Sequence, residues 1–132
     1  MITILLCIAE AIYFEARNQP QEGQLAVAQV ILNRTRHPDY PDNPCDVVRQ
    51  GKYIGTHPLR HKCQFTYYCD GLKETIKDKP AFGTAFINAA AVYFGLPDTT
   101  GGATHYHADY ARPYWSAEME YLTRIEGHLF YK

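Results

Sequence analysis

Apolar residues recur at helical spacing over residues 3–17. At about 100° per residue, six of them fall in one arc of about 140°: Ile4, Leu5, Ile8, Ala9, Ile12 and Ala16. Glu10 and Arg17 fall on the opposite side, where the charged residues of a surface helix lie. The pattern predicts an amphipathic helix over residues 3–17.

Proline marks the boundaries of the next two elements. A second helix begins at Pro20, which takes its first position, and continues to about Arg36, where His37 and Pro38 stop it. Between residues 39 and 55 the chain is rich in Pro, Asp and Gly, and the spacing leaves room only for a short helical turn at 46–50.

The second half of the chain alternates β-prone and helical stretches. Residues 64–68 are β-prone and end at a turn over 69–71. A third helix runs from near Pro80 to a C-cap at Gly95. Residues 101–132 mix short strands with turns. The elements together predict an α+β domain that is mainly helical, with a small β element.

Length and charge narrow the class of protein. A chain of 132 residues suits a single domain over 1–132. Its net charge of -1 argues against nucleic-acid binding. The apolar start lacks the basic residues and the cleavage site of a signal peptide, and Glu10 and Glu15 make it too short for a membrane span. Eleven Tyr, six Phe and one Trp suit either a groove for a polar, ring-shaped ligand or the edge of a core.

One carboxylate lies where apolar residues are expected. Glu15 falls inside the apolar arc of the first helix. Burial disfavours the charged form of a carboxyl group, so such a group stays protonated near neutral pH and can serve as the general acid in glycosidic bond cleavage. The alternative is that Glu15 forms an ion pair with Arg17 or Arg34 inside the fold.

Several segments together resemble one known family. Residues 12–34, IYFEARNQPQEGQLAVAQVILNR, are similar to the signature of the cell wall hydrolase family typified by spore cortex-lytic enzymes (SleB-type). The match continues through CDVV at 45–48, CQFTYYCDG at 63–71, GGATHYH at 101–107 and the closing GHLFYK. The resemblance implies a lysozyme-like fold, peptidoglycan glycan strands as substrate, no cofactor, and lytic transglycosylation with Glu15 as the catalytic acid.

The cysteines allow more than one arrangement. Four cysteines permit three disulfide pairings, and the spacing of Cys63 and Cys69 is too wide for an ordinary zinc site. Cys7, in the first helix, is most simply a buried thiol. Because Cys45, Cys63 and Cys69 lie in the segments that match the family, we expect a disulfide to join two of these and Cys7 to stay free.

The chain departs from the family pattern in two ways. Asn18 stands where the family has glycine, and Asn tolerates a positive φ better than most residues. Many relatives have a signal sequence and a wall-binding domain, neither of which is evident here. We therefore expect a monomeric phage endolysin, made in the host cytoplasm and brought to the wall by a holin-type release protein.

The resemblance also suggests substrate-binding residues. Glycan rings offer apolar faces and many hydroxyl and acetamido groups, so aromatic and amide side chains suit them. The candidates are Gln64, Phe65, Tyr68, Asp70, Tyr106, His107 and Trp115. Phe65 equally suits a core position. If Asp70 faces Glu15, a hydrolytic muramidase with two carboxylates replaces the transglycosylase; Asp70 also suits a turn residue that binds its own backbone.

Two other classes of function remain open. The alternating His105, His107 and Asp109, with Cys63 or His128, could form the zinc site of an N-acetylmuramoyl-L-alanine amidase. A glycan-binding module without activity would keep the aromatic residues but would not need Glu15. We expect no metal site, because alternate residues of a strand share a face for packing as readily as for metal binding.

Overall fold

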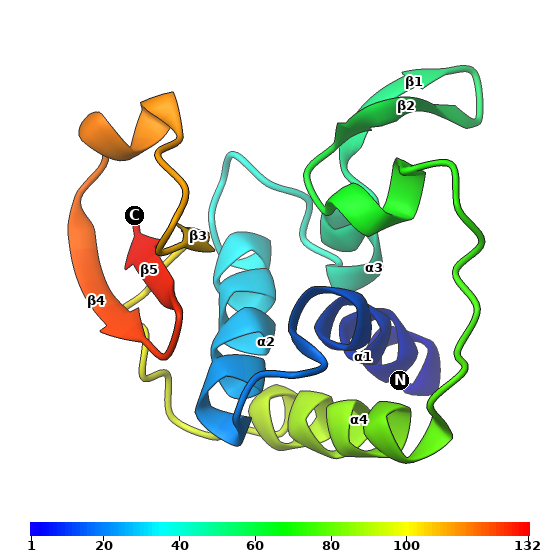
Figure 1. Cartoon of the computed structure of the whole chain (residues 1–132), viewed down its shortest axis with the longest axis horizontal. Coiled ribbons are helices and arrows are strands. Elements are labelled where there is room, and N and C mark those ends of the chain that lie inside the picture. The colour runs from blue at the N-terminus through cyan, green and yellow to red at the C-terminus, as the bar shows by residue number, and fades with distance from the viewer.

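Four helices form the larger part of the molecule, as shown by a computed structural model that describes all 132 residues (Figure 1). The long helices are α1 (Ile2–Ala16), α2 (Gln21–Thr35) and α4 (Lys79–Tyr93), and α3 (Pro44–Val48) is short. The helices predicted from the sequence are therefore confirmed, within a few residues at each end. No helix has the length and apolarity needed to cross a membrane.

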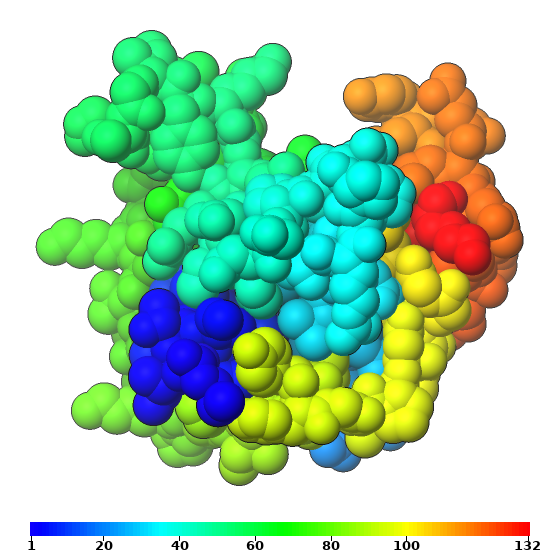
Figure 2. Space-filling model, turned by 180° about the vertical axis from the view of Figure 1, so that it is seen from behind, coloured from blue at the N-terminus to red at the C-terminus, as the bar shows by residue number.

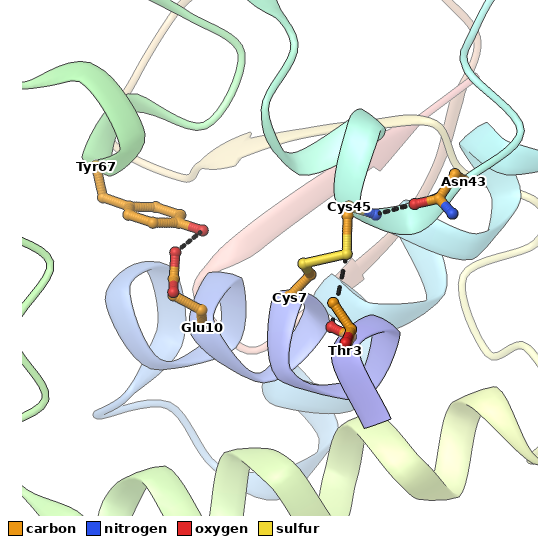
Figure 3. The surroundings of a disulfide bond; sticks show 6 residues. All are labelled: Thr3, Cys7, Glu10, Asn43, Cys45 and Tyr67. Carbon is orange, nitrogen blue, oxygen red and sulfur yellow. Dashed lines mark hydrogen bonds between the residues drawn. A yellow bond between two sulfur atoms is a disulfide. The ribbon is translucent and has the colours of Figure 1, made fainter. Parts of the chain in front are cut away.

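The first helix is central rather than superficial. Besides the predicted arc, Cys7, Ala11 and Tyr13 are buried, so α1 contacts protein on most sides. The prediction that Glu10 lies on the solvent side is wrong: it is half-buried, and the Tyr67 hydroxyl donates a hydrogen bond to it at 3.2 Å (Figure 3). Phe14 stacks on the same Tyr67 ring, with the ring centroids 4.8 Å apart.

Capping residues explain where the helices begin and end. Pro20 is the N-cap of α2, one position before the place predicted for it. Asn43 caps α3 and Asp78 caps α4, each by accepting a hydrogen bond from a backbone N–H of the first turn. Gly95 follows α4 with a φ of +117°, a conformation that ends a helix and favours glycine.

A two-stranded hairpin follows α3, in a region where the sequence analysis placed no strand. It consists of β1 (Gly51–Ile54) and β2 (His57–Cys63), which pair antiparallel. The predicted β-structure at 64–68 is wrong, because Thr66–Cys69 forms a short 3-10 helix, η1. The Cys63–Cys69 disulfide joins the end of β2 to η1 and makes this part of the chain compact.

A three-stranded antiparallel sheet completes the fold. Its order is β3-β5-β4, with β3 at His105–Ala108, β4 at Tyr121–Ile125 and β5 at His128–Tyr131. A second 3-10 helix, η2 (Tyr114–Ala117), lies between β3 and β4. These strands confirm the prediction of short strands and turns in the last part of the chain.

The core has two parts of unequal size, and α2 lies between them (Figure 1). Seventeen buried residues, mostly from α1, α2, α3 and α4, form the larger cluster. The smaller cluster joins α2 to the sheet and has four buried members, which are Ala26, Val30, Ala103 and Phe130. The sheet is thus attached to the helical body through one face of α2.

The disulfide pairing confirms the expected bridge between two of Cys45, Cys63 and Cys69, but the prediction that Cys7 stays free is wrong. Cys7 of α1 is bonded to Cys45 of α3 (Figure 3), and Cys63 is bonded to Cys69. Cys7 is therefore not a free thiol, and no cysteine is unpaired. The first bridge closes a long loop and fixes α3 against α1, a contact between helices that the sequence alone does not reveal.

Two parts of the chain project from the same side of the molecule. Figure 1 shows the β1–β2 hairpin and the segment with η2 on either side of the loop between α2 and α3. Seen from behind in Figure 2, the hairpin (green) and the segment with η2 (orange) rise above the surface between them.

Candidate active site

A cavity of about 360 Å³ lies where the ends of α1 and α2 meet η1 and the sheet. Its volume is in the range of small-ligand sites. Six separate stretches of the chain line it, and their residues are Glu15, Arg34, Gln64, Phe65, Thr66, His105, Tyr106, His107, Ala108, Tyr110, Trp115 and His128. Glu15 is the one carboxylate among them.

Glu15 lies in the last turn of α1, and its carboxyl group is largely withdrawn from water. Burial raises the pKa of Glu15 from 4.5 to about 7. The alternative of an ion pair is wrong, because neither Arg17 nor Arg34 forms a salt bridge with it; both salt bridges of the protein lie elsewhere. Arg17 instead donates to the Tyr13 hydroxyl. Glu15 is therefore a neutral proton donor below a pH of about 7.

The end of α1 is held by a buried amide. The Gln24 side chain donates to the carbonyl oxygens of Ala16 and Arg17, each at 3.3 Å, which satisfies groups left open at the helix end. The oxygen of Gln24 accepts from the Asn88 side chain at 2.8 Å. Asn18, which follows, does not have a positive φ, so glycine has no advantage there and this departure from the family leaves the turn intact.

The last turn of α2 fixes the strand that forms the opposite wall. The side-chain amide of Asn33 donates to the Ala103 carbonyl at 2.9 Å, and Arg34 Nε donates to the Thr104 carbonyl at 2.7 Å. Both acceptors directly precede β3. The position of β3 relative to Glu15 therefore depends on two polar side chains of one helical turn.

The wall formed by β3 is aromatic, and its His105 and Tyr106 side chains are uncharged near neutral pH. Burial and the nearby Glu15 raise the pKa of Tyr106, so its hydroxyl keeps its proton. Burial and Arg34 lower the pKa of His105 to about 4, so His105 is neutral near neutral pH. His107 Nδ1 lies 2.7 Å from the Ala108 carbonyl, to which it donates, and Nε2 lies 2.9 Å from the Tyr131 hydroxyl.

Trp115, from η2, extends this wall. Its ring centroid lies 5.1 Å from that of His105, 5.6 Å from that of His107 and 5.5 Å from that of Tyr131. The three rings fix the indole at the cavity surface. An aromatic face here suits the apolar face of a sugar ring.

Five of the seven predicted substrate-binding residues line the cavity with Glu15: Gln64, Phe65, Tyr106, His107 and Trp115. Phe65 is only 2% exposed and also belongs to the larger core cluster. Tyr68 and Asp70 do not line the cavity. The Asp70 carboxylate accepts from the Leu72 backbone N–H at 2.8 Å, as a turn residue does, so the arrangement required for a second carboxylate is not present.

The residues considered for zinc do not converge. No group of three His, Cys, Asp or Glu side chains has the arrangement of a metal site. Cys63 is in a disulfide, and the Asp109 carboxylate accepts from Arg124 at 2.7 Å. His105 and His107 instead belong to the aromatic wall.

Sequence reasoning missed part of the lining. The sequence suggests Arg34 only as an ion-pair partner for Glu15, and it gives no signal for Tyr110. The sequence suggests His128 only as a possible zinc ligand, but β5 pairs with β3 and places it opposite Ala108, at the cavity. Only the tertiary fold brings these residues to Glu15.

The chain belongs to the cell wall hydrolase family, whose model matches residues 18–131. Glu15 lies just before the matched segment. The chain is 36% identical over 124 residues to the spore cortex-lytic enzyme of Halalkalibacterium halodurans, covering 93% of this chain and 33% of the relative. It is 49% identical over 41 residues to that of Bacillus subtilis, covering 31% of this chain and 13% of the relative. The chain thus spans about a third or less of these two relatives.

Two solved structures have the same fold. The catalytic domain of the germination-specific lytic transglycosylase SleB from Bacillus anthracis superposes with a TM-score of 0.77 at 27% identity, covering 100% of this chain and 96% of that one. The catalytic domain of Bacillus cereus SleB gives a TM-score of 0.76 at 27% identity, covering 100% and 91%. The predicted lysozyme-like α+β fold is confirmed.

Proposed function

We propose that this chain is a peptidoglycan lytic transglycosylase that cleaves the β-1,4 bond between N-acetylmuramic acid and N-acetylglucosamine, with Glu15 as its single catalytic acid. The name of one solved relative, a germination-specific lytic transglycosylase, supports the reaction class. The observation that carries the proposal is the cavity itself: one carboxyl group, kept neutral by burial, faces a wall of aromatic rings, and no second carboxylate lines the space.

The number of carboxylates selects the chemistry. A hydrolase with two carboxylates needs the second one roughly 5–9.5 Å from the acid, as nucleophile or as base for water. A transglycosylase needs one, because the substrate supplies its own nucleophile. The lining of the cavity therefore favours the transglycosylase over the muramidase.

The reaction balances with Glu15 alone. The Glu15 hydroxyl donates its proton to the glycosidic oxygen, the bond from that oxygen to C1 of muramic acid breaks, and the oxygen keeps the electron pair. Positive charge develops at C1. The 6-hydroxyl of the same sugar then attacks C1 and returns its proton to the Glu15 carboxylate. The product is a 1,6-anhydro-muramic end, and no water is consumed.

The other predicted residues have roles in binding. Trp115 and Tyr106 offer ring faces to the sugars, and Gln64 offers an amide to acetamido and hydroxyl groups. His107 lines the cavity and is oriented by Ala108 and Tyr131. Tyr68 and Asp70 do not line this cavity. If they contact the glycan, they contact sugars further along the strand than the two that are joined by the cleaved bond.

Replacing Glu15 by Gln tests the catalytic acid. The Glu15→Gln variant keeps the shape of the side chain but cannot donate an acid proton, so cleavage of purified peptidoglycan should fall about 10²–10⁴-fold. Glu10→Gln is the matched control, because Glu10 lies on the same helix, outside the cavity, and the amide can still accept from Tyr67. Cleavage by Glu15→Gln at the wild-type rate would overturn the proposal.

Mass spectrometry of the released fragments tests the outcome of the reaction. Anhydro-muramic ends support the transglycosylase. Reducing muramic ends would instead establish a muramidase, and free stem peptides would establish an amidase. The last activity should also be lost on treatment with a chelator, to which the proposed reaction is insensitive.

The cellular setting is part of the same proposal. We propose a phage endolysin that acts as a monomer on the wall, reaching the periplasm through a holin-type protein. Expression in a bacterial host with and without a holin tests it: lysis should require the holin, and lysis without one would contradict this setting.

A further inference from the structure

Arg34 is the one buried cation of the cavity, and its hydrogen bonding is incomplete. The side chain is 5% exposed, at the end of α2. Its Nε donates to the Thr104 carbonyl, but neither terminal nitrogen donates to a protein atom, and Nη1 is fully covered without a partner. Burying a charged donor without a partner is costly, so an acceptor from outside the chain would stabilise it.

No group of the protein neutralises this charge. The two salt bridges are His37 with Asp39 and Arg124 with Asp109. The guanidinium carbon lies 5.2 Å from the ring centroid of Tyr40 and 5.6 Å from that of Phe65. These rings attract the cation, but they do not replace oxygen acceptors for the N–H groups in its plane.

The cavity is therefore electropositive although the whole chain has a net charge of -1. Glu15 is the only acidic side chain in the lining, and it is neutral below a pH of about 7. His105 is neutral as well. A guanidinium in such a place is suited to a carboxylate, because hydrogen bonds between two charged groups are stronger than those between neutral groups.

We propose that Arg34 binds a carboxylate of the muramyl unit and thereby selects peptidoglycan over neutral β-1,4 glycans such as chitin. This inference rests on the proposed function, which places the glycan strand in this cavity. The carboxylate has two possible sources: the lactyl group of a peptide-free muramic acid, and the stem peptide of a substituted one. Chitin, a polymer of N-acetylglucosamine, has neither.

Calorimetric binding to the inactive Glu15→Gln variant tests the inference and separates the sources. The three probes are the peptide-free disaccharide of N-acetylglucosamine and N-acetylmuramic acid, the same disaccharide with its stem peptide, and chitobiose. At least one acidic probe should bind about tenfold more tightly than chitobiose. Whichever acidic probe shows the preference identifies the carboxylate that is bound.

A second substitution assigns the preference to Arg34. In the Glu15→Gln background, Arg34→Gln should abolish the tenfold preference for the acidic probe over chitobiose, whereas Arg34→Lys, which keeps the charge, should retain part of it. The lost hydrogen bond to Thr104 should weaken the binding of all three probes by the same factor, so the preference is the quantity that reports on the carboxylate. Arg36→Gln is the matched control, because Arg36 is an exposed cation two residues further on and does not line the cavity. Equal weakening of all three probes with the preference kept would overturn the inference and show that Arg34 only holds β3.

A change in the ligand covers the case in which Arg34→Gln fails to fold. Coupling methylamine to the carboxylates of the preferred probe removes their charge and leaves the protein intact. The affinity should fall about tenfold, to that of chitobiose, and an unchanged affinity would overturn the inference. The proposed function can fail independently of this inference. If the acidic probe is preferred but no anhydro products form, the transglycosylase is contradicted and the role of Arg34 is not. If no acidic probe binds, both are contradicted.

Discussion

The two walls of the cavity are built in different ways. The helical wall supplies Glu15 and Arg34, and α1 and α2 lie against a cluster of seventeen buried residues. The sheet wall supplies the rings of Tyr106, His107 and Trp115, and it is joined to the body through a cluster of only four buried residues and through hydrogen bonds from the end of α2.

This difference matches the demands of the proposed reaction. Proton transfer requires a group whose position and pKa are fixed, and a densely packed helix end satisfies both. Sugar binding depends on the contact area of rings and tolerates small movements. The helical wall, which supplies the proton donor, is thus the better packed of the two. The sheet wall, which binds the sugar, is more easily displaced by a substitution.

The largest expected effect is on the free energy of unfolding, when one aliphatic side chain is truncated behind each of the two walls. Ile12→Ala removes a fully buried side chain from the larger cluster and should lower the free energy of unfolding by about 2–5 kcal/mol. Leu122→Ala removes a partly buried side chain beside the smaller cluster and should cost about 1 kcal/mol. Urea denaturation measures both, and equal losses would show that the two walls share a single core.

Much of the helical body was predictable because its signals are local. The apolar spacing of α1, the proline at the start of α2 and the glycine after α4 each act within a few residues. The disulfide pairing was not predictable, because Cys7 meets Cys45 only through the packing of α1 on α3. The β-propensity of residues 64–68 misled because the Cys63–Cys69 bridge and the packing of Tyr67 on Phe14 stabilise a tight turn instead.

The two walls should also respond in opposite ways to pH. In the fold, the pKa of Glu15 is raised from 4.5 to about 7, so its contribution to stability is complete below a pH of about 4.5 and is lost as the pH rises through about 7. The pKa of His105 is lowered from 6.5 to about 4, so its contribution is complete above a pH of about 6.5 and is lost as the pH falls toward 4.

Urea denaturation between pH 4 and 9 separates these effects. Relative to wild type, Glu15→Gln should gain stability as the pH rises from about 4.5 to about 7, by at most about 3 kcal/mol. His105→Gln should gain as the pH falls below about 6.5. Wild-type activity should decline above a pH of about 7, as the acid form of Glu15 is lost. Parallel pH profiles for the two variants and wild type would contradict the difference between the walls.

The candidate site was predictable only at the position where a charged residue lies on the apolar face of its helix. Glu15 was evident because a carboxylate stood among apolar neighbours. Arg34 was not, because a cation in the last turn of a helix is favourable for ordinary electrostatic reasons. Asp70 misled because an Asp-Gly pair suits a turn as well as a site, and the observed hydrogen bond to Leu72 is that of a turn.

The smallest expected effect concerns binding by the sheet wall. Trp115 lines the cavity, but η2 has no buried residue, so Trp115→Ala should weaken glycan binding about tenfold while the free energy of unfolding changes by less than about 1 kcal/mol. The neighbouring Tyr114 is 87% exposed and does not line the cavity, so Tyr114→Ala is the matched control and should leave binding unchanged.

Steady-state kinetics on soluble glycan fragments should show the Trp115→Ala defect mainly in KM, with kcat little changed, because the indole is proposed to hold the sugar and takes no part in proton transfer. A defect confined to kcat would mean that the sheet wall also positions the reacting atoms. A loss of stability as large as that of Ile12→Ala would mean that the rings around Trp115 form a core of their own, and the contrast between the walls would then be lost.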